Sequence, residues 1–142
     1  MLVRSNLVEH PTAMLGEVGL DRSFRISYQS IPSPPPRRLS SFITPIQHQL
    51  AILEAQIGLA VELKRHISMH SVAAQQITID LLSRMKERHE AAWRAISIDL
   101  HSCGLSLESW KTLEVRLLHN IRSTILPVFR KATTTYSYRY QL

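Results

Sequence analysis

Apolar residues recur every three or four positions through most of the chain after residue 44, and this spacing constrains the fold more than any other feature. Thr44 and Pro45 predict a helix start, because a threonine caps free amides and proline fits the first helical position. We expect this helix to run to about Ser68. Its inner stripe comprises Ile46, Leu50, Leu53, Ile57 and Ala60.

Two further helices are expected along the same chain. The second should occupy about 72–102 and end at Gly104, since glycine is common just past helix ends. The boundary between the first two helices is weakly marked, and one continuous helix is the alternative. Ser106 predicts the start of a third helix, which Pro127 should kink or end. Its inner face would comprise Trp110, Leu113, Leu117 and Ile121.

Two short segments alternate apolar and polar residues, which is the pattern of a half-buried strand. One lies at 23–29 and the other at 133–141, and a proline-rich linker at 29–45 follows the first. The expected fold is therefore mainly α: an antiparallel three-helix bundle whose two strands pair at one end or between subunits. We expect residues 1–43 to form an N-terminal arm with the linker, and residues 44–142 to form the bundle with its tail strand.

The net charge of +6 is distributed unevenly along the 142 residues. Residues 1–43 carry +2, residues 44–104 carry 0 and residues 105–142 carry +4. No apolar run is long enough for a membrane span or a signal peptide, so neither is expected. The one cysteine, Cys103, cannot form an intramolecular disulfide, which favours a reducing, intracellular location in the cytoplasm or nucleus.

Catalytic motifs are weak in this sequence. The four glycines form no phosphate-binding loop, and no Gly-x-Ser-x-Gly motif occurs. Glu62, His66 and His70 are spaced four apart and could bind a metal from one helix face, but a solvated helix surface is the favoured interpretation. His101 lies near Cys103, and a structural cysteine is favoured there. We therefore expect no enzyme, no catalytic residue, no metal and no cofactor.

Two groups of residues are candidates for binding. Pro32, Pro35 and Arg37 match the PxxPxR pattern that Src-homology 3 domains bind, and Ser40 follows a basic pair as in kinase substrates. Basic side chains of the C-terminal third, interleaved with tyrosines, could contact nucleic acid. These candidates are Arg116, Arg122, Arg130, Lys131 and Arg139.

The wide apolar stripes and the two unpartnered strands favour self-association. The sequence therefore predicts a non-enzymatic assembly or adaptor protein that acts through protein–protein interaction, as a homo-oligomer with a protein partner. Its composition suits a small viral or accessory protein. The alternative is a nucleic-acid-binding protein that uses its basic C-terminal third, and binding to generic DNA and RNA across salt concentrations would separate the two.

Overall fold

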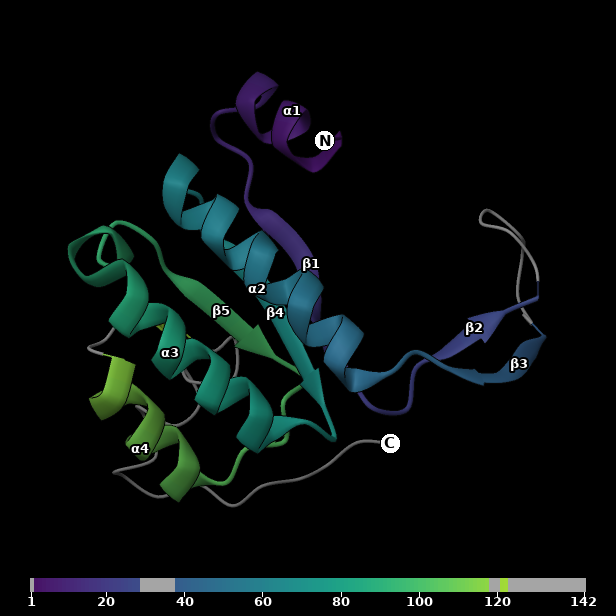
Figure 1. Ribbon diagram of the computed structural model, residues 1–142. Coiled ribbons are helices and arrows are strands. Elements are labelled where there is room, and N and C mark those ends of the chain that lie inside the picture. Colours follow the sequence, from purple (N-terminus) through teal and green to yellow (C-terminus); the bar gives the residue numbers. More distant parts are fainter. Residues whose placement is uncertain (1, 29–37, 118–120, 123–142) are drawn as a thin grey trace, which may run out of the picture.

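The computed structural model describes residues 2–28, 38–117 and 121–122, and it combines helices with a parallel sheet (Figure 1). The elements follow one another in the order α1 (Leu2–Glu9), β1 (Leu15–Asp21), β2 (Arg25–Ser27), β3 (Leu39–Ile43), α2 (Ile46–Leu63), β4 (Ile67–Val72), α3 (Gln75–Trp93), β5 (Ile98–His101), α4 (Leu107–Leu117) and β6 (Ile121–Arg122). The expected three-helix bundle is therefore wrong.

The main sheet has the strand order β1-β4-β5-β6, and every neighbouring pair in it is parallel. Helices follow β4 and β5 in the chain, as the crossover between parallel strands requires. In register, Gly19 pairs with His70, and His70 pairs with His101. A second, two-stranded sheet pairs β2 with β3 antiparallel.

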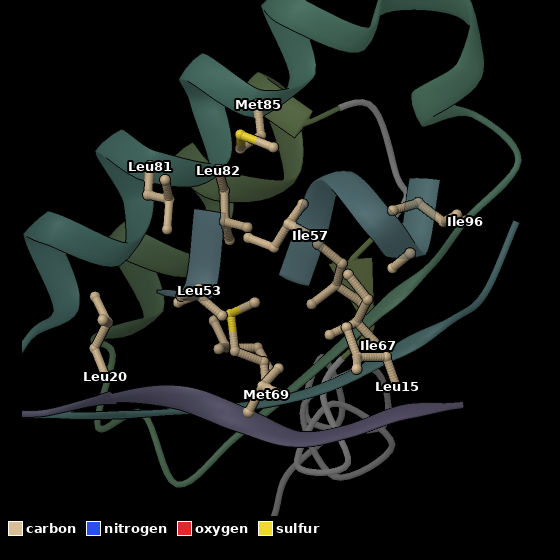
Figure 2. Close-up of a cluster of buried hydrophobic side chains, with 14 of the residues drawn as sticks. Leu15, Leu20, Leu53, Ile57, Ile67, Met69, Leu81, Leu82, Met85 and Ile96 are labelled. Atoms are coloured by element: carbon tan, nitrogen blue, oxygen red, sulfur yellow. The ribbon is translucent and has the colours of Figure 1, made fainter. Parts of the chain in front are cut away.

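The core lies between the main sheet and helices α2 and α3 (Figure 2). Alternate residues of β4 and β5 point into it, because successive side chains of a strand face opposite sides. The buried strand residues include Ile67, Met69, Ile98 and Leu100, which pack with Leu53, Ile57, Leu81 and Leu82 from the helices. The other face of these strands carries Ser68, His70, Asp99 and His101, and all four are half-buried.

The bundle prediction fails at segments that turn out to be strands, and one of them is β6, because Ile121 was expected on the third helix but α4 ends at Leu117. Two more strands replace parts of the first and second helices. The first helix ends at Leu63 rather than Ser68, because Lys64 adopts a left-handed conformation and its N–H bonds to Ala60 and Val61. The second ends at Trp93 rather than near residue 102. Residues 67–72 and 98–101 then alternate buried and half-buried side chains as β4 and β5. Two parallel strands thus replace a turn and a helix end.

Other expectations agree with the structure or lie outside it. The Ser106 hydroxyl accepts the N–H of Ser109 at 3.1 Å at the start of α4, and Trp110 and Leu113 are buried. The strand expected at 23–29 exists in part as β2, but it pairs with β3, a strand that occupies part of the linker expected at 29–45. The tail strand at 133–141 lies outside the described residues. The division of the chain at residue 43 stays a prediction.

Helix α1 is held in place by hydrogen bonds from two arginines and by one buried leucine. Arg4 donates two hydrogen bonds of 2.6 Å to the Glu62 carboxylate. Leu7 is buried, and its carbonyl accepts a hydrogen bond of 3.0 Å from Arg65. Within the described ranges, no helix has the length and apolar character to cross a membrane.

Candidate metal centre

Glu17, His70 and His101 meet on the sheet face that turns away from the core. Register places the two histidines side by side, on β4 and at the last residue of β5. The register of β1 against β4 shifts between Leu15 and Val18, so Glu17 is not paired with a residue of β4. Glu17 Oε1 lies 2.7 Å from His70 Nδ1 and 3.0 Å from His101 Nε2.

The electrostatics of this cluster favour an ionised carboxylate. Hydrogen bonds from His101 and then from His70 lower the pKa of Glu17 below its ordinary value. Because an ionised carboxylate only accepts hydrogen bonds, His70 Nδ1 and His101 Nε2 each carry the shared proton in this arrangement. Glu17 is exposed and the two histidines are half-buried, so the cluster is open to solvent.

The three side chains have the chemistry of a metal site. Their ligand atoms lie within 4.8 Å of one another, and in the described part of the chain no other group of three potential ligands meets this condition. Two imidazole nitrogens and one carboxylate oxygen suit Zn²⁺ and similar divalent cations. A cation would take the place of the two shared protons, since metal ligands must be deprotonated. The residues present therefore fit a metal ion.

A close approach between β1 and β4 holds His70 in place. A Cβ built on Gly19 would lie 2.1 Å from the His70 carbonyl oxygen and 2.9 Å from His70 Cδ2. No side chain fits in that space, so only glycine permits this strand spacing. Gly19 is thus part of the support of the cluster.

A pocket of about 310 Å³ adjoins the cluster at the edge of β1. It shares His70 with the cluster, and its other lining residues come from β1, from α2 and from the segments that join them to β2 and β3. Gln49 joins the two ends of the segment that runs from β1 to α2, because its Nε2 donates to the carbonyls of Asp21 and Thr44 at 2.9 Å each. The pocket wall beside the cluster is therefore fixed by hydrogen bonds.

The metal-binding stripe considered from the sequence does not form. Glu62 of α2 pairs with Arg4 of α1. His66 Nδ1 accepts the N–H of Ser97 at 3.0 Å, at the other end of β4 from the cluster. Only His70 of that stripe belongs to the cluster. Helical spacing had grouped residues that the structure distributes among a helix, the segment that follows it and a strand.

None of the candidate binding residues belongs to the group Glu17, His70 and His101, and most lie outside the described residues. Ser40 is in β3 and only 2% exposed, and its hydroxyl accepts the N–H of Phe42 at 3.2 Å. Arg116 belongs to α4 and Arg122 to β6. The remaining candidates, Pro32, Pro35, Arg37, Arg130, Lys131 and Arg139, lie outside the described residues. The binding roles of both groups stay predictions.

One sequence signal could have revealed the histidine pair. Residues 67–70 read Ile-Ser-Met-His and residues 98–101 read Ile-Asp-Leu-His, so the same apolar–polar alternation ends twice on histidine. Two parallel strands with this pattern, paired in register, bring their histidines side by side on one face of the sheet. Glu17 has no comparable signal, because its position depends on the irregular register of β1.

Comparison with known protein families matches residues 2–127 to the family described as TatD related DNase. The chain belongs to this family. The family is of the TIM-barrel type, which agrees with parallel strands covered by helices on one face. Among curated proteins, Cut9-interacting protein scn1 from Schizosaccharomyces pombe is 36% identical over 84 residues, which cover 57% of this chain and 25% of that protein. No solved structure matches.

This membership corrects the functional expectations drawn from the sequence. A match to a DNase family over residues 2–127 overturns the non-enzymatic assembly or adaptor function and the viral or accessory character. It also overturns the expectation that the chain is not an enzyme. The findings favour the nucleic-acid alternative instead. The chain spans about a quarter of the length of the curated relative it matches.

Proposed function

We propose that Glu17, His70 and His101 bind a divalent metal ion in a site that hydrolyses phosphodiester bonds of DNA. The observation that carries this proposal is the convergence of three potential ligands within 4.8 Å in a member of a DNase family. Active sites of TIM-barrel enzymes lie at the carboxyl ends of the strands, and His101 is the last residue of β5.

Each side chain has a distinct task in this proposal. Glu17 supplies the single negative charge among the ligands, and the two histidines bind as neutral imidazoles. The centre then keeps one net positive charge with a divalent ion, which is the sign that attracts a phosphodiester. A bound ion of this kind lowers the pKa of a coordinated water and neutralises charge on the phosphate.

The sheet gives the ligands a rigid support. His70 and His101 pair in register on neighbouring strands, so backbone hydrogen bonds fix the separation of their side chains. Glu17 is exposed, which leaves room for a polymeric substrate to approach. Sites built on strands hold their ligands more precisely than sites on loops.

The cellular location and the binding partners of the chain remain proposals. The buried free thiol of Cys103 supports an intracellular location, in the cytoplasm or nucleus. Self-association and binding of a protein partner stay predictions, which a mass measurement in solution would test.

The proposal is tested by titrating the chain with Zn²⁺ and Mn²⁺ by calorimetry and by following cleavage of a labelled DNA strand. Glu17→Gln and His101→Asn should each weaken metal binding at least about tenfold and abolish cleavage. Glu9→Gln and His10→Asn are matched controls, because they make the same changes at exposed positions beyond the sheet.

Circular dichroism of all four variants should match that of the unsubstituted chain. Cleavage that persists in excess EDTA would contradict the proposal. Metal affinity that is the same in Glu17→Gln as in Glu9→Gln would contradict it as well.

A further inference from the structure

The two strands β2 and β3 reach away from the sheet and helices and form a projecting arm (Figure 1). We define the hairpin arm as residues 22–28 and 38–43. Its large apolar side chains are about half exposed or more, with Phe42 at 66% and Tyr28 at 63%. The others are Phe24, Ile26, Leu39 and Ile43. A cluster of this kind on one projecting element is typical of a binding surface.

The charge of the hairpin arm indicates an anionic partner. Arg22, Arg25 and Arg38 are exposed, and residues 22–28 and 38–43 contain no aspartate or glutamate. The Arg38 guanidinium lies 5.5 Å from the centre of the Tyr28 ring, so positive charge and an aromatic face occur together. Arginines beside exposed aromatic rings are typical of proteins that bind single-stranded nucleic acid, where bases stack and phosphates are neutralised.

The position of the hairpin arm connects it to the metal centre. The arm begins directly after β1, the strand that carries Glu17. Phe24 of the arm and His70 of the metal centre line the same pocket of about 310 Å³. His48 and Gln56 of α2 line it too, and both can hydrogen-bond to a base edge. A nucleic-acid strand bound to the hairpin arm would therefore reach the metal centre through this pocket.

We propose that the hairpin arm binds single-stranded DNA, stacking bases on Phe24, Tyr28 and Phe42, and that it guides the strand to the metal centre. The guiding role rests on the proposed nuclease function, whereas the binding itself does not. Unpaired bases are required, because a ring stacks on an aromatic side chain only when its neighbouring base has moved away. The substrate class is thus single-stranded DNA or a frayed duplex end.

The test measures fluorescence anisotropy of a labelled short oligothymidylate with the full chain, in EDTA so that nothing is cleaved. The unsubstituted chain should bind this strand at least about tenfold more tightly than a duplex of equal length. Arg25→Ala with Arg38→Ala should weaken binding at least about tenfold and flatten the salt dependence by roughly 0.7 per lost contact. Phe24→Ala and Phe42→Ala should each weaken it about fivefold or more.

A charge-matched control separates the arm from a general effect of positive charge. Arg94→Ala with Lys111→Ala removes two exposed positive charges outside the arm, one directly after α3 and one within α4. This control should bind as tightly as the unsubstituted chain. An equal loss of affinity in both double variants would overturn the proposal.

Hydrogen exchange of the unsubstituted chain gives a second measurement that does not depend on any variant folding. Amides of residues 22–28 and 38–43 should exchange more slowly when the oligothymidylate is added. Exchange there that slows with protein concentration but not with DNA would show self-association through the arm and overturn the proposal. Strand binding without cleavage under any metal would instead refute the nuclease function alone, and cleavage that is unchanged when the arm is altered would refute the guiding role alone.

Discussion

Gly19→Ala should damage both the fold and the metal centre through a single methyl group. The added Cβ would lie 2.1 Å from the His70 carbonyl oxygen, more than an ångström closer than ordinary contact, which begins at 3.4 Å. That oxygen belongs to the backbone of a central strand, so it cannot rotate away as a side chain would. Overpacking a tight site costs about 1–3 kcal/mol, and we expect a loss near 3 kcal/mol here.

The same substitution should weaken metal binding, because relief of the clash moves the backbone of His70. Loss of a group that orients a metal ligand lowers affinity about 10–100-fold, and we expect an effect in that range for Zn²⁺. Gly58→Ala is the matched control. Gly58 lies within α2 with no atom within 4 Å of its added Cβ, so alanine should stabilise the helix by about 0.5–1 kcal/mol.

The assay uses two measurements. Urea denaturation is monitored through the fluorescence of the buried Trp93 and Trp110, and Zn²⁺ binding is measured by calorimetric titration. The two variants should change the free energy of unfolding in opposite directions, and only Gly19→Ala should lose metal affinity. Equal stability of the two variants would refute the reasoning about strand spacing. Zn²⁺ affinity of Gly19→Ala within about twofold of the unsubstituted chain would refute its link to His70.

Three further predictions concern the core, the α1 contact and the thiol. Leu53→Ala should cost about 2–5 kcal/mol in urea denaturation because Leu53 is 1% exposed, whereas Val115→Ala, at 76% exposure, should change stability by less than about 0.5 kcal/mol. Arg4 lowers the pKa of Glu62 below 4.5, so the stabilisation from this pair is complete above pH 4.5 and disappears as pH falls through the lowered value. Hydrogen exchange of α1 should show this acid sensitivity, and Glu62→Gln should remove it. Burial raises the pKa of the Cys103 thiol, so a thiol reagent should label it slowly until urea unfolds the chain.

Local signals predicted part of the fold correctly. The start of α2 was predicted to within one residue, although Pro45 rather than Thr44 is the N-cap and no side chain caps this helix. The hydroxyl of Ser106 caps α4 as its position in the sequence indicates. These features depend on neighbours within one helical turn. Trp110 and Leu113 were placed on the buried face for the same reason.

The strands were missed because the same residues fit two periods. Ile96, Leu100 and Cys103 follow helical spacing, while Ile96, Ile98 and Leu100 follow the alternation of a strand. A strand of four residues offers too few positions to decide between them. The tertiary pairing of β4 with β5 selects the strand, and no local pattern contains that pairing.

The candidate metal centre could not be predicted from the sequence for a related reason. Its three potential ligands come from three strands, and Glu17 is far from His70 and His101 in the sequence. Their proximity depends on the parallel register and on the irregular pairing of β1. A prediction that starts from helices cannot bring them together, since it assigns His70 to a turn and His101 to a helix end.

The hydrogen bonds of Gln49 have a consequence for how this chain can change over evolution. Its side chain joins Asp21 to Thr44, which are the two ends of the segment that carries the hairpin arm. Closing a longer loop costs only about 0.6 kcal/mol for each doubling of length. Residues between these two ends can therefore be inserted, deleted or exchanged for another segment without shifting β1 or β4, so the arm can diversify while the residues of the metal centre keep their places.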